Sequence, residues 1–557
     1  MLIRGRSRRW MLLLTALALV AAACSGGGGE AAEGGDPSEA GGEAGTEGGA
    51  TGGEMSYYVG EPEHLAPPSN VTESNGDAVT DALFSPLVEL DLETSEAIWG
   101  DDAPNAVAAN VESEDQQTFT ITLKDGWTFH DGTPVTAQSY VDTWNEGARN
   151  AEYTGNYFFS TIEGYNEVQG TESEAPAAEE MSGLEVVDDL TFEVTLSEPF
   201  SQFPLVISYT AFYPLSEGCL ADMAACQEAP VGNGPFQMDG QWNHDQNVRV
   251  TRYEDFGGGT PPKIDAIDFR VYADLNTGYT DLQAGNLDVM DSLPPEQIEA
   301  AEQELGDRVI RGDSSTYTFL GFPTYDEAFS DPNLRKAISM AIDRQAITDA
   351  ILPDRVPADA WVSPVVAGYE EGACGEVCTY DPQQARQLFD EAGGYEGTMT
   401  LWFNSGAGHE EWMEAVSNLL RENLGIESIE FESLDFAEYL PLLQAEEVTG
   451  PYRLAWVMDY PSPQNYLENL LYTGSSSNYT GWSNEEFDSL IDQGNAAGSV
   501  EEGLEFYSQA QEILVDEVPS APLFFDLIAA AHSERVSNVV FDTQEDMDYT
   551  AVEITEG

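Results

Sequence analysis

The chain has 557 residues, of which 101 are acidic and 20 are basic, so its formal net charge at pH 7 is −81. So few cations exclude the common nucleic-acid-binding classes, because phosphate contacts need patches of Lys and Arg. Hydrophobic residues make up 41% of the chain. About 500 foldable residues exceed one hydrophobic core, so we expect a globular protein of at least two lobes.

The acidic residues are spread over every segment, and lysine occurs only at Lys124, Lys263 and Lys336. One interpretation is a protein that binds polycations. The other, which we favour, is a halophile's exterior, because molar salt shortens the reach of charge repulsion to about 3 Å.

The first 24 residues have the order of an export signal. Four arginines lie within residues 4–9, an apolar run covers Met11 to Val20, and small residues lead to Cys24. The run is too short to span a bilayer comfortably. We predict a lipoprotein signal peptide over 1–24 with Cys24 lipidated; an ordinary secretory signal with an incidental cysteine is the alternative. The sequence leaves open whether export follows the general secretory or the twin-arginine route.

Residues 25–54 are rich in Gly and Glu and show no apolar periodicity. A glycine-rich chain of about 30 residues behaves as a flexible coil that spans about 30 Å. We therefore expect a disordered tether that holds the protein at the cell membrane, lipid-anchored and facing the outside.

The first half of the globular part has mostly strand patterns. Thr118–Leu123 alternates polar and apolar residues, the period of a half-buried strand, and Leu190–Leu196 alternates again. Trp127–Phe129 is predicted as a further short strand. Ala137–Ala148 is predicted as a helix, since Tyr140 and its neighbours share one face.

The second half alternates helical and strand patterns, which predicts an α/β protein with unequal lobes. The predicted helices are Leu334–Ile351, Pro382–Ala392, Glu410–Leu424, Asn484–Gln493 and Glu501–Leu514. The predicted strands between them include Met399–Phe403, Ile429–Leu434 and Arg453–Val457.

Four cysteines remain once Cys24 is assigned to lipid. Cys219 lies close to Cys226 in sequence, and Cys374 lies close to Cys378. In an oxidising compartment this spacing predicts two local disulfides that stiffen loops. The alternative is a four-cysteine zinc site, which lacks the usual two-residue spacing within each pair.

Several stretches resemble one family. They are Lys124–Ala137 (KDGWTFHDGTPVTA), Val231–Phe236 (VGNGPF), Arg252–Gly258 (RYEDFGG), Asn333–Arg344 and Tyr380–Gly393. In this order they resemble motifs of the family 5 solute-binding proteins, the peptide-binding (oligopeptide and dipeptide) subunits of ABC importers. The resemblance runs from about Tyr57 to about Phe525.

The resemblance implies an α/β, two-lobed fold of the type II periplasmic-binding-protein kind, with a hinge and an additional β-rich subdomain in the N-terminal lobe. One lobe would cover 55–273 plus 521–557 and the other 274–520. A short peptide would bind between them, and the lobes would close by hinge motion. The partners would be the transmembrane subunits of an ABC permease, and we expect a monomer with no cofactor and no metal.

The stretch Arg453–Pro463 (RLAWVMDYPSP) resembles the family segment whose aspartate binds the α-ammonium of the peptide, which here is Asp459. A carboxylate between the lobes forms strong charge-assisted hydrogen bonds with an ammonium group. The alternative is that Asp459 only caps a turn before proline. Residues before it would bind the peptide backbone by strand addition. The predicted ligand-binding residues are Asp459, Trp456, Met458 and Tyr460, with Glu61–Asn70 on the opposite lobe.

Enzyme motifs are incomplete. His409–Met413 begins like a zinc-protease helix but lacks the second histidine, and Gly474–Ser477 lacks the pattern of a nucleophile elbow. We therefore expect a peptide receptor and not an enzyme. The alternatives are the same fold binding an oligosaccharide or a metal chelate, and a secreted acidic hydrolase.

Overall fold

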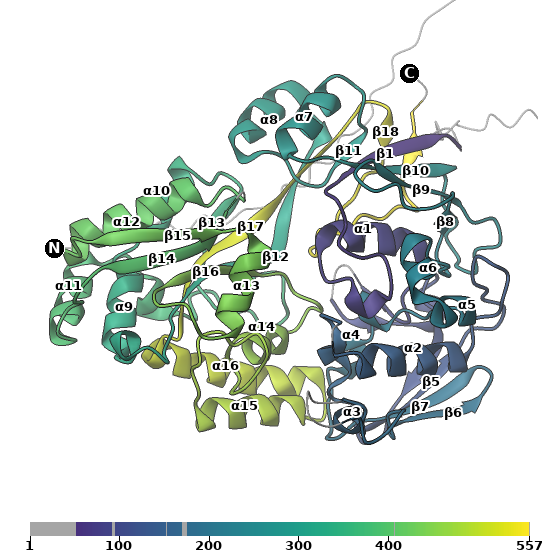
Figure 1. Cartoon of the computed structure of the whole chain (residues 1–557), viewed down its shortest axis with the longest axis horizontal. Helices are drawn as coiled ribbons and strands as arrows, with labels where there is room; N and C mark the ends of the chain where they lie inside the picture. The colour runs from purple at the N-terminus through teal and green to yellow at the C-terminus, as the bar shows by residue number, and fades with distance from the viewer. Residues whose placement is uncertain (1–51, 92–94, 152, 170–174, 406, 556–557) are drawn as a thin grey trace, which may run out of the picture. The chain divides into compact units, whose positions relative to one another are not determined.

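Two long strands, β12 (Val309–Gly321) and β17 (Ser520–His532), pair antiparallel in the middle of the largest sheet (Figure 1). The computed structural model describes residues 52–91, 95–151, 153–169, 175–405 and 407–555. The predicted signal peptide, Cys24 and nearly all of the predicted tether lie outside the described residues. In the described part of the chain, no helix is long and apolar enough to cross a membrane.

The central sheet has 11 strands that come from both halves of the chain. Their order is β15 (Ile429–Leu434), β14 (Met399–Asn404), β16 (Tyr452–Trp456), β12, β17, β11 (Val289–Met290), β1 (Glu54–Val59), β10 (Ala266–Val271), β9 (Asn247–Arg252) and β8 (Phe236–Met238), with β13 (Arg355–Pro357) paired to β17.

The strands β12 and β17 each connect two hydrophobic cores. The segment 521–525 of β17 packs into a core built from residues 317–525, whereas Ile528 and Ala530 pack against β1 and β10 in another. The register of the β12–β17 pair shifts between Asp313 and Tyr317, close to the point where β12 changes cores. These paired strands are the connection between the lobes of a two-lobed α/β fold.

Helices cover the sheet in the core of residues 317–525. They are α9 (Pro332–Met340), α10 (Arg344–Ala350), α11 (Pro382–Glu391), α12 (Glu410–Leu424), α13 (Phe436–Gln444), α14 (Pro463–Leu471), α15 (Glu485–Asn495) and α16 (Val500–Glu517). Four of the five predicted helices coincide with α11, α12, α15 and α16 to within three residues at each end.

The β-rich subdomain contains a separate four-stranded sheet. Its order is β4 (Ala108–Glu112), β5 (Thr118–Leu123), β7 (Thr191–Thr195) and β6 (Leu184–Asp188). Helix α2 (Ala137–Arg149) packs on it, with Trp144 fully buried against Phe192 and Phe212. The short helices α3 (Tyr165–Val168) and α4 (Phe203–Val206) complete this core.

Two smaller cores flank β1. One includes α1 (Ser74–Leu83), α5 (Glu217–Ala221) and α6 (Met223–Glu228), and the other includes α7 (Leu275–Gln283) and α8 (Ile298–Leu305). Two-stranded pairs are β2 (Glu89–Leu90) with β3 (Ala97–Ile98) and β18 (Val536–Ser537) with β19 (Glu553–Ile554). The predicted lobe bounds, 55–273 plus 521–557 and 274–520, stay predictions.

Two predicted elements differ in the structure. The helix predicted over Leu334–Ile351 is broken between α9 and α10, because the Asp343 carboxylate accepts a hydrogen bond from Ala346 N and starts a new helix. The strand predicted at Trp127–Phe129 is reduced to a single bridge between Thr128 and Pro134, since its other hydrogen bonds close a tight turn.

The motifs near His130 pack against one another. His130 N donates to Gly232 O, and its ring lies 3.2 Å from both Gly232 N and Gly234 O. Burial lowers the pKa of His130 to about 4, so the ring is neutral at pH 7. Trp127 stacks edge-on against Phe256. These motif residues therefore join the four-stranded sheet to the central one.

Candidate functional site

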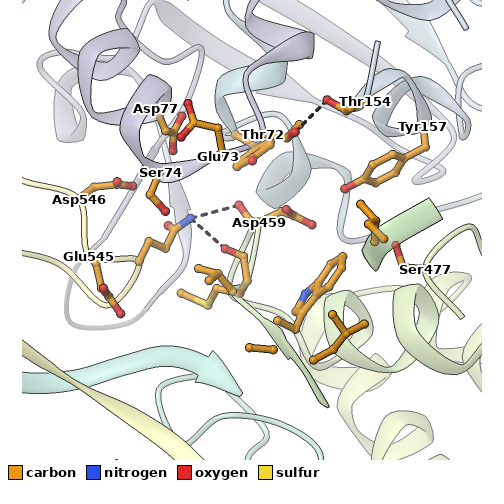
Figure 2. A pocket seen from close by; sticks show the side chains of 18 of the residues that line it. Thr72, Glu73, Ser74, Asp77, Thr154, Tyr157, Asp459, Ser477, Glu545 and Asp546 are labelled. Atoms are coloured by element: carbon orange, nitrogen blue, oxygen red, sulfur yellow. Dashed lines mark hydrogen bonds between the residues drawn. The ribbon is translucent and has the colours of Figure 1, made fainter. Parts of the chain in front are cut away.

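A cavity of about 870 Å³ lies beside the end of β16 (Figure 2). Its walls come from β16 and α13, from α1 and the residues before it, from residues 151 and 153–157, and from a loop near the C-terminus, residues 544–549. The volume is within the usual range for small-ligand sites. None of residues 61–70 is among its lining residues; Thr72–Ala78 contribute that wall instead.

Asp459 lies at the edge of this cavity, directly after β16. Its carboxylate Oδ2 accepts a hydrogen bond of 2.7 Å from Asn465 Nδ2, and its backbone N donates to Asn465 Oδ1 at 3.1 Å. Among the described residues, Asn465 is the only side chain that donates a hydrogen bond to this carboxylate. Burial raises the pKa of Asp459 to about 7. The carboxylate is thus held in place with capacity for a further donor.

Asn465 also fixes the neighbouring aromatic side chain. Its Oδ1 accepts a hydrogen bond of 2.9 Å from Trp456 Nε1, and Asn465 is fully buried on α14. Ser462 caps this helix, with its hydroxyl accepting from Gln464 N. Asn465 was not among the predicted ligand-binding residues, although Ser462-Pro463, which begins three residues after Asp459, is a typical helix start.

The other predicted ligand-binding residues differ in position. Trp456 and Met458 line the cavity, and Met458 O and Asp459 O both accept weak hydrogen bonds from Gln544 Nε2. Tyr460 is not among the lining residues: its ring packs in the core of the β-rich subdomain and its hydroxyl donates to Gln464 Oε1 at 2.6 Å.

Strand β16 has one partly open edge at the cavity. It pairs with β12 from Tyr452 to Trp456, whereas β14 pairs with it only at Tyr452. The residues Leu454–Met458, which follow along the open edge, line the cavity. An extended chain in the cavity can therefore pair with this backbone.

The cavity wall is strongly acidic. Its carboxyl side chains are Glu73, Asp77, Asp291, Asp459, Glu545 and Asp546, and none of the described lining residues is Lys, Arg or His. Burial raises the pKa of Asp291 to about 7, and it also raises the pKa of Glu545. Figure 2 shows Asp77, Asp459, Glu545 and Asp546 around one space. Such a wall favours a cationic group.

Two partly buried arginines, Arg355 and Arg453, are not among the lining residues of this cavity. Arg453, on β16, donates to Asn404 Oδ1 at 3.0 Å, and Arg355 Nε lies 3.3 Å from Asp526 Oδ2. Five buried nitrogens of this group make no hydrogen bond with the described residues: Arg355 Nε and Nη1, Arg453 Nε, Trp402 Nε1 and His409 Nε2. Arg453 is six residues before Asp459. Our sequence analysis singled out neither arginine as a binding residue.

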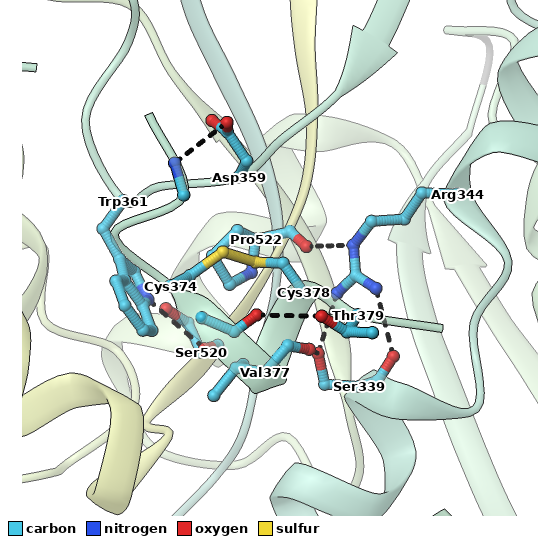
Figure 3. The surroundings of a disulfide bond; sticks show 12 residues. Ser339, Arg344, Asp359, Trp361, Cys374, Val377, Cys378, Thr379, Ser520 and Pro522 are labelled. Atoms are coloured by element: carbon cyan, nitrogen blue, oxygen red, sulfur yellow. Dashed lines mark hydrogen bonds between the residues drawn. A yellow bond between two sulfur atoms is a disulfide. The ribbon is translucent and has the colours of Figure 1, made fainter. Parts of the chain in front are cut away.

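The structure pairs the cysteines as neighbours in sequence. Cys219 is bonded to Cys226 with a Cα–Cα distance of 4.9 Å, and Cys374 is bonded to Cys378 with a distance of 5.8 Å (Figure 3). The two pairs belong to different hydrophobic cores. A zinc site shared by all four cysteines is therefore incompatible with this arrangement.

The chain was compared with known proteins. The family model of the bacterial extracellular solute-binding proteins, family 5 middle, matches residues 103–478. The dipeptide-binding protein DppE of Bacillus subtilis is 27% identical over 529 residues, covering 90% of this chain and 92% of the relative.

Two solved structures share the fold. The murein tripeptide binding protein MppA of Escherichia coli has a TM-score of 0.77 at 21% identity, covering 91% of this chain and 100% of that structure. OppA of Haemophilus influenzae, in complex with the peptide RPPGFSPFR, has a TM-score of 0.75 at 20% identity, covering 90% and 99%. The two-lobed fold predicted from the sequence is thus confirmed.

Proposed function

Because this chain belongs to the family 5 bacterial extracellular solute-binding proteins, we propose that it captures short peptides outside the cytoplasm and delivers them to the permease of an ABC importer. The family consists of solute-binding proteins, not enzymes. The observation that carries the proposal is the Asp459 carboxylate, held by Asn465 at the edge of a cavity that has no cationic side chain among its described lining residues.

In the proposed complex, the peptide's α-ammonium pairs with Asp459 and its backbone adds to the open edge of β16. Trp456 and Met458 contact the peptide, while Tyr460 supports the segment from the core behind it. Backbone hydrogen bonds are independent of side-chain identity, so this mode accepts many sequences.

The carboxylate end of the peptide is proposed to bind near Arg355 and Arg453. Their N–H groups that lack a partner can donate hydrogen bonds to a carboxylate. Buried donors normally have such an acceptor. A peptide with an amidated C-terminus should therefore bind the wild-type protein more weakly than the free acid. In Arg453→Gln this difference should shrink; an unchanged difference would remove Arg453 from the site.

We also propose that Cys24 carries the lipid anchor, that residues 25–54 act as a tether, and that the protein works as a monomer on the outer face of the cell membrane. The disulfides at Cys219–Cys226 and Cys374–Cys378 suit that oxidising location. Mass spectrometry of the membrane-extracted protein tests the anchor through the mass of its N-terminal peptide.

The decisive experiment is mass spectrometry of whatever the protein releases when it is denatured after gentle purification in high salt. We expect a mixture of short peptides whose lengths define the size limit of the site. Release of a single sugar oligomer or metal chelate would keep the family and overturn both the peptide ligand and the role of Asp459.

A further inference from the structure

A second cavity, of about 630 Å³, adjoins the first. Both are lined by Asp77, Tyr209, Asp459, Gln544, Asp546, Met547 and Tyr549. A ligand held at Asp459 therefore borders both spaces, and one of its side chains can extend from the first into the second.

The second cavity is also acidic. Nine of its lining residues carry carboxyl groups: Asp77, Asp81, Glu89, Asp91, Asp102, Asp459, Asp542, Asp546 and Asp548. None of its described lining residues is Lys, Arg or His. Buried carboxylates are normally paired with a cation or fully hydrogen-bonded.

Three of these carboxylates converge. Asp77 and Asp81 are one turn apart on α1, and Asp546 approaches them from the C-terminal loop. One oxygen of each lies within 4.8 Å of the others. The Tyr213 hydroxyl donates to Asp81 Oδ1 at 3.1 Å. Burial raises the pKa of Asp81 to about 7, and the pKa values of Asp77 and Asp546 are raised further by the neighbouring acids.

Few hydrogen-bond donors among the described residues contact these three carboxyl groups. Asp77 Oδ1 is buried and accepts no hydrogen bond from the described residues. The hydroxyl of Thr210, a residue that lines the same cavity and is only 5% exposed, lies close enough to Asp77 to lower its pKa. A buried acceptor without a donor beside three carboxylates calls for a ligand group that is positively charged and donates several hydrogen bonds.

We propose that this second cavity is the subsite for a basic side chain of the bound peptide, whose ammonium or guanidinium group sits between Asp77, Asp81 and Asp546. A cavity of about 630 Å³ is far larger than a bare metal ion needs and has room for a long side chain. This inference rests on the proposed peptide-binding function and adds a preference for Lys- or Arg-containing peptides.

The test is calorimetric titration of the full-length mature protein with tetrapeptides that are identical except for one position. Lysine is compared with norleucine, its uncharged counterpart, at each position in turn. At one position we expect lysine to bind roughly tenfold or more tightly than norleucine, the effect of one close charge pair. In Asp81→Asn this ratio should fall towards one, whereas the matched control Glu414→Gln, an exposed acid on α12, should keep it.

The outcomes separate the two proposals. If no tetrapeptide binds, the peptide-binding function fails. If lysine and norleucine peptides bind equally at every position, the function stands and the basic subsite is overturned. If calcium chloride without peptide binds to wild type but not to Asp81→Asn, the cation is a metal ion and the subsite is likewise overturned. Even if Asp81→Asn fails to fold, the ratio of lysine-peptide to norleucine-peptide affinity in the wild-type protein decides whether the basic subsite exists.

Discussion

At the scale of single residues, one buried amide organises the candidate ligand site. Asn465 binds the Asp459 carboxylate through its Nδ2 and the Trp456 indole through its Oδ1. Fixing both groups before the ligand arrives reduces the entropy that binding would otherwise cost. Asp459 thus does more than cap a turn: it presents a carboxylate to a cavity.

Replacing that carboxylate should weaken binding. Asp459→Asn keeps the side-chain shape but removes the negative charge, so we expect free-amine peptides to lose about 2–5 kcal/mol of binding free energy. Calorimetric titration measures the loss. N-acetylated peptides, which have no ammonium, should bind both proteins alike. Equal affinity of wild type and Asp459→Asn for a free-amine peptide would exclude the ammonium contact.

The clustered carboxyls predict an unusual pH dependence of stability. Asp81, Asp291 and Asp459 have folded-state pKa values of about 7 against ordinary values of 3.8. Between about pH 4 and 7 the folded protein therefore holds protons that the unfolded chain has lost, and the free energy of unfolding rises as pH falls through 7.

We thus expect the melting temperature of the ligand-free protein to increase from pH 8 to pH 6. Other buried carboxyls act in the same direction, since burial also raises the pKa values of Asp526 and Asp542 to about 6, whereas it keeps the pKa values of His130 and His409 low. Asp81→Asn should have a shallower increase. A melting temperature that stays constant or decreases from pH 8 to pH 6 would contradict the raised pKa values of the carboxyl groups in the cavity walls.

At the scale of elements, Arg344 gives a structural reason for the stretch Asn333–Arg344, which resembles a family motif. Its guanidinium donates to Pro522 O at 2.6 Å and to the Ser339 carbonyl and hydroxyl (Figure 3). Ser339 in turn donates to Val377 O, next to the Cys374–Cys378 bond. One buried cation therefore ties α9, α10 and β17 together.

Removal of this cation should be costly. Arg344→Met leaves several buried carbonyls without donors, and we expect a loss of about 3 kcal/mol in the free energy of unfolding. Urea denaturation measures it. The control is Arg149→Met, which removes a half-exposed partner of Glu146 on α2 and should cost less than about 1 kcal/mol. If Arg344→Met lowers the free energy of unfolding as little as the control does, Arg344 does not hold α9, α10 and β17 together.

At the scale of the whole molecule, charge and topology act together. The acidic side chains that produce the net charge of −81 repel one another across the surface, and salt screens that repulsion. We expect the melting temperature to rise from dilute buffer to molar KCl. The calorimetric scan should be repeated with Asp81→Asn, because screening of exposed charges should act on both proteins alike. A melting temperature that decreases with added KCl would contradict the halophile interpretation.

We expect the strands β12 and β17 to act as the hinge for closure of the two lobes. Each passes from one hydrophobic core to another, and their register shifts between Asp313 and Tyr317. Bulged pairing weakens a sheet locally, so bending there disturbs neither core. A ligand that contacts both sides of the cavity would stabilise one position of this hinge.

Local periodicity and motif order in the amino-acid sequence were enough to predict most of the local elements and the family. Residue periodicity placed α12 and β5 at their observed bounds, because a helix face and a strand face repeat within a few residues. The motif order indicated the two-lobed fold, and the match of Arg453–Pro463 pointed to Asp459 as a cavity residue.

Contacts between residues far apart in the sequence follow from the path of the folded chain. Asp77 and Asp81 on α1 face Asp546 near the C-terminus, more than 460 positions away, because β17 returns the chain beside β11, which also pairs with β1. The same chain path lets Gln544 Nε2 donate hydrogen bonds to the carbonyl oxygens of Met458 and Asp459. No local pattern encodes these contacts, since they depend on strand order in the sheet, and among 101 acidic residues nothing in the sequence distinguishes the few that converge.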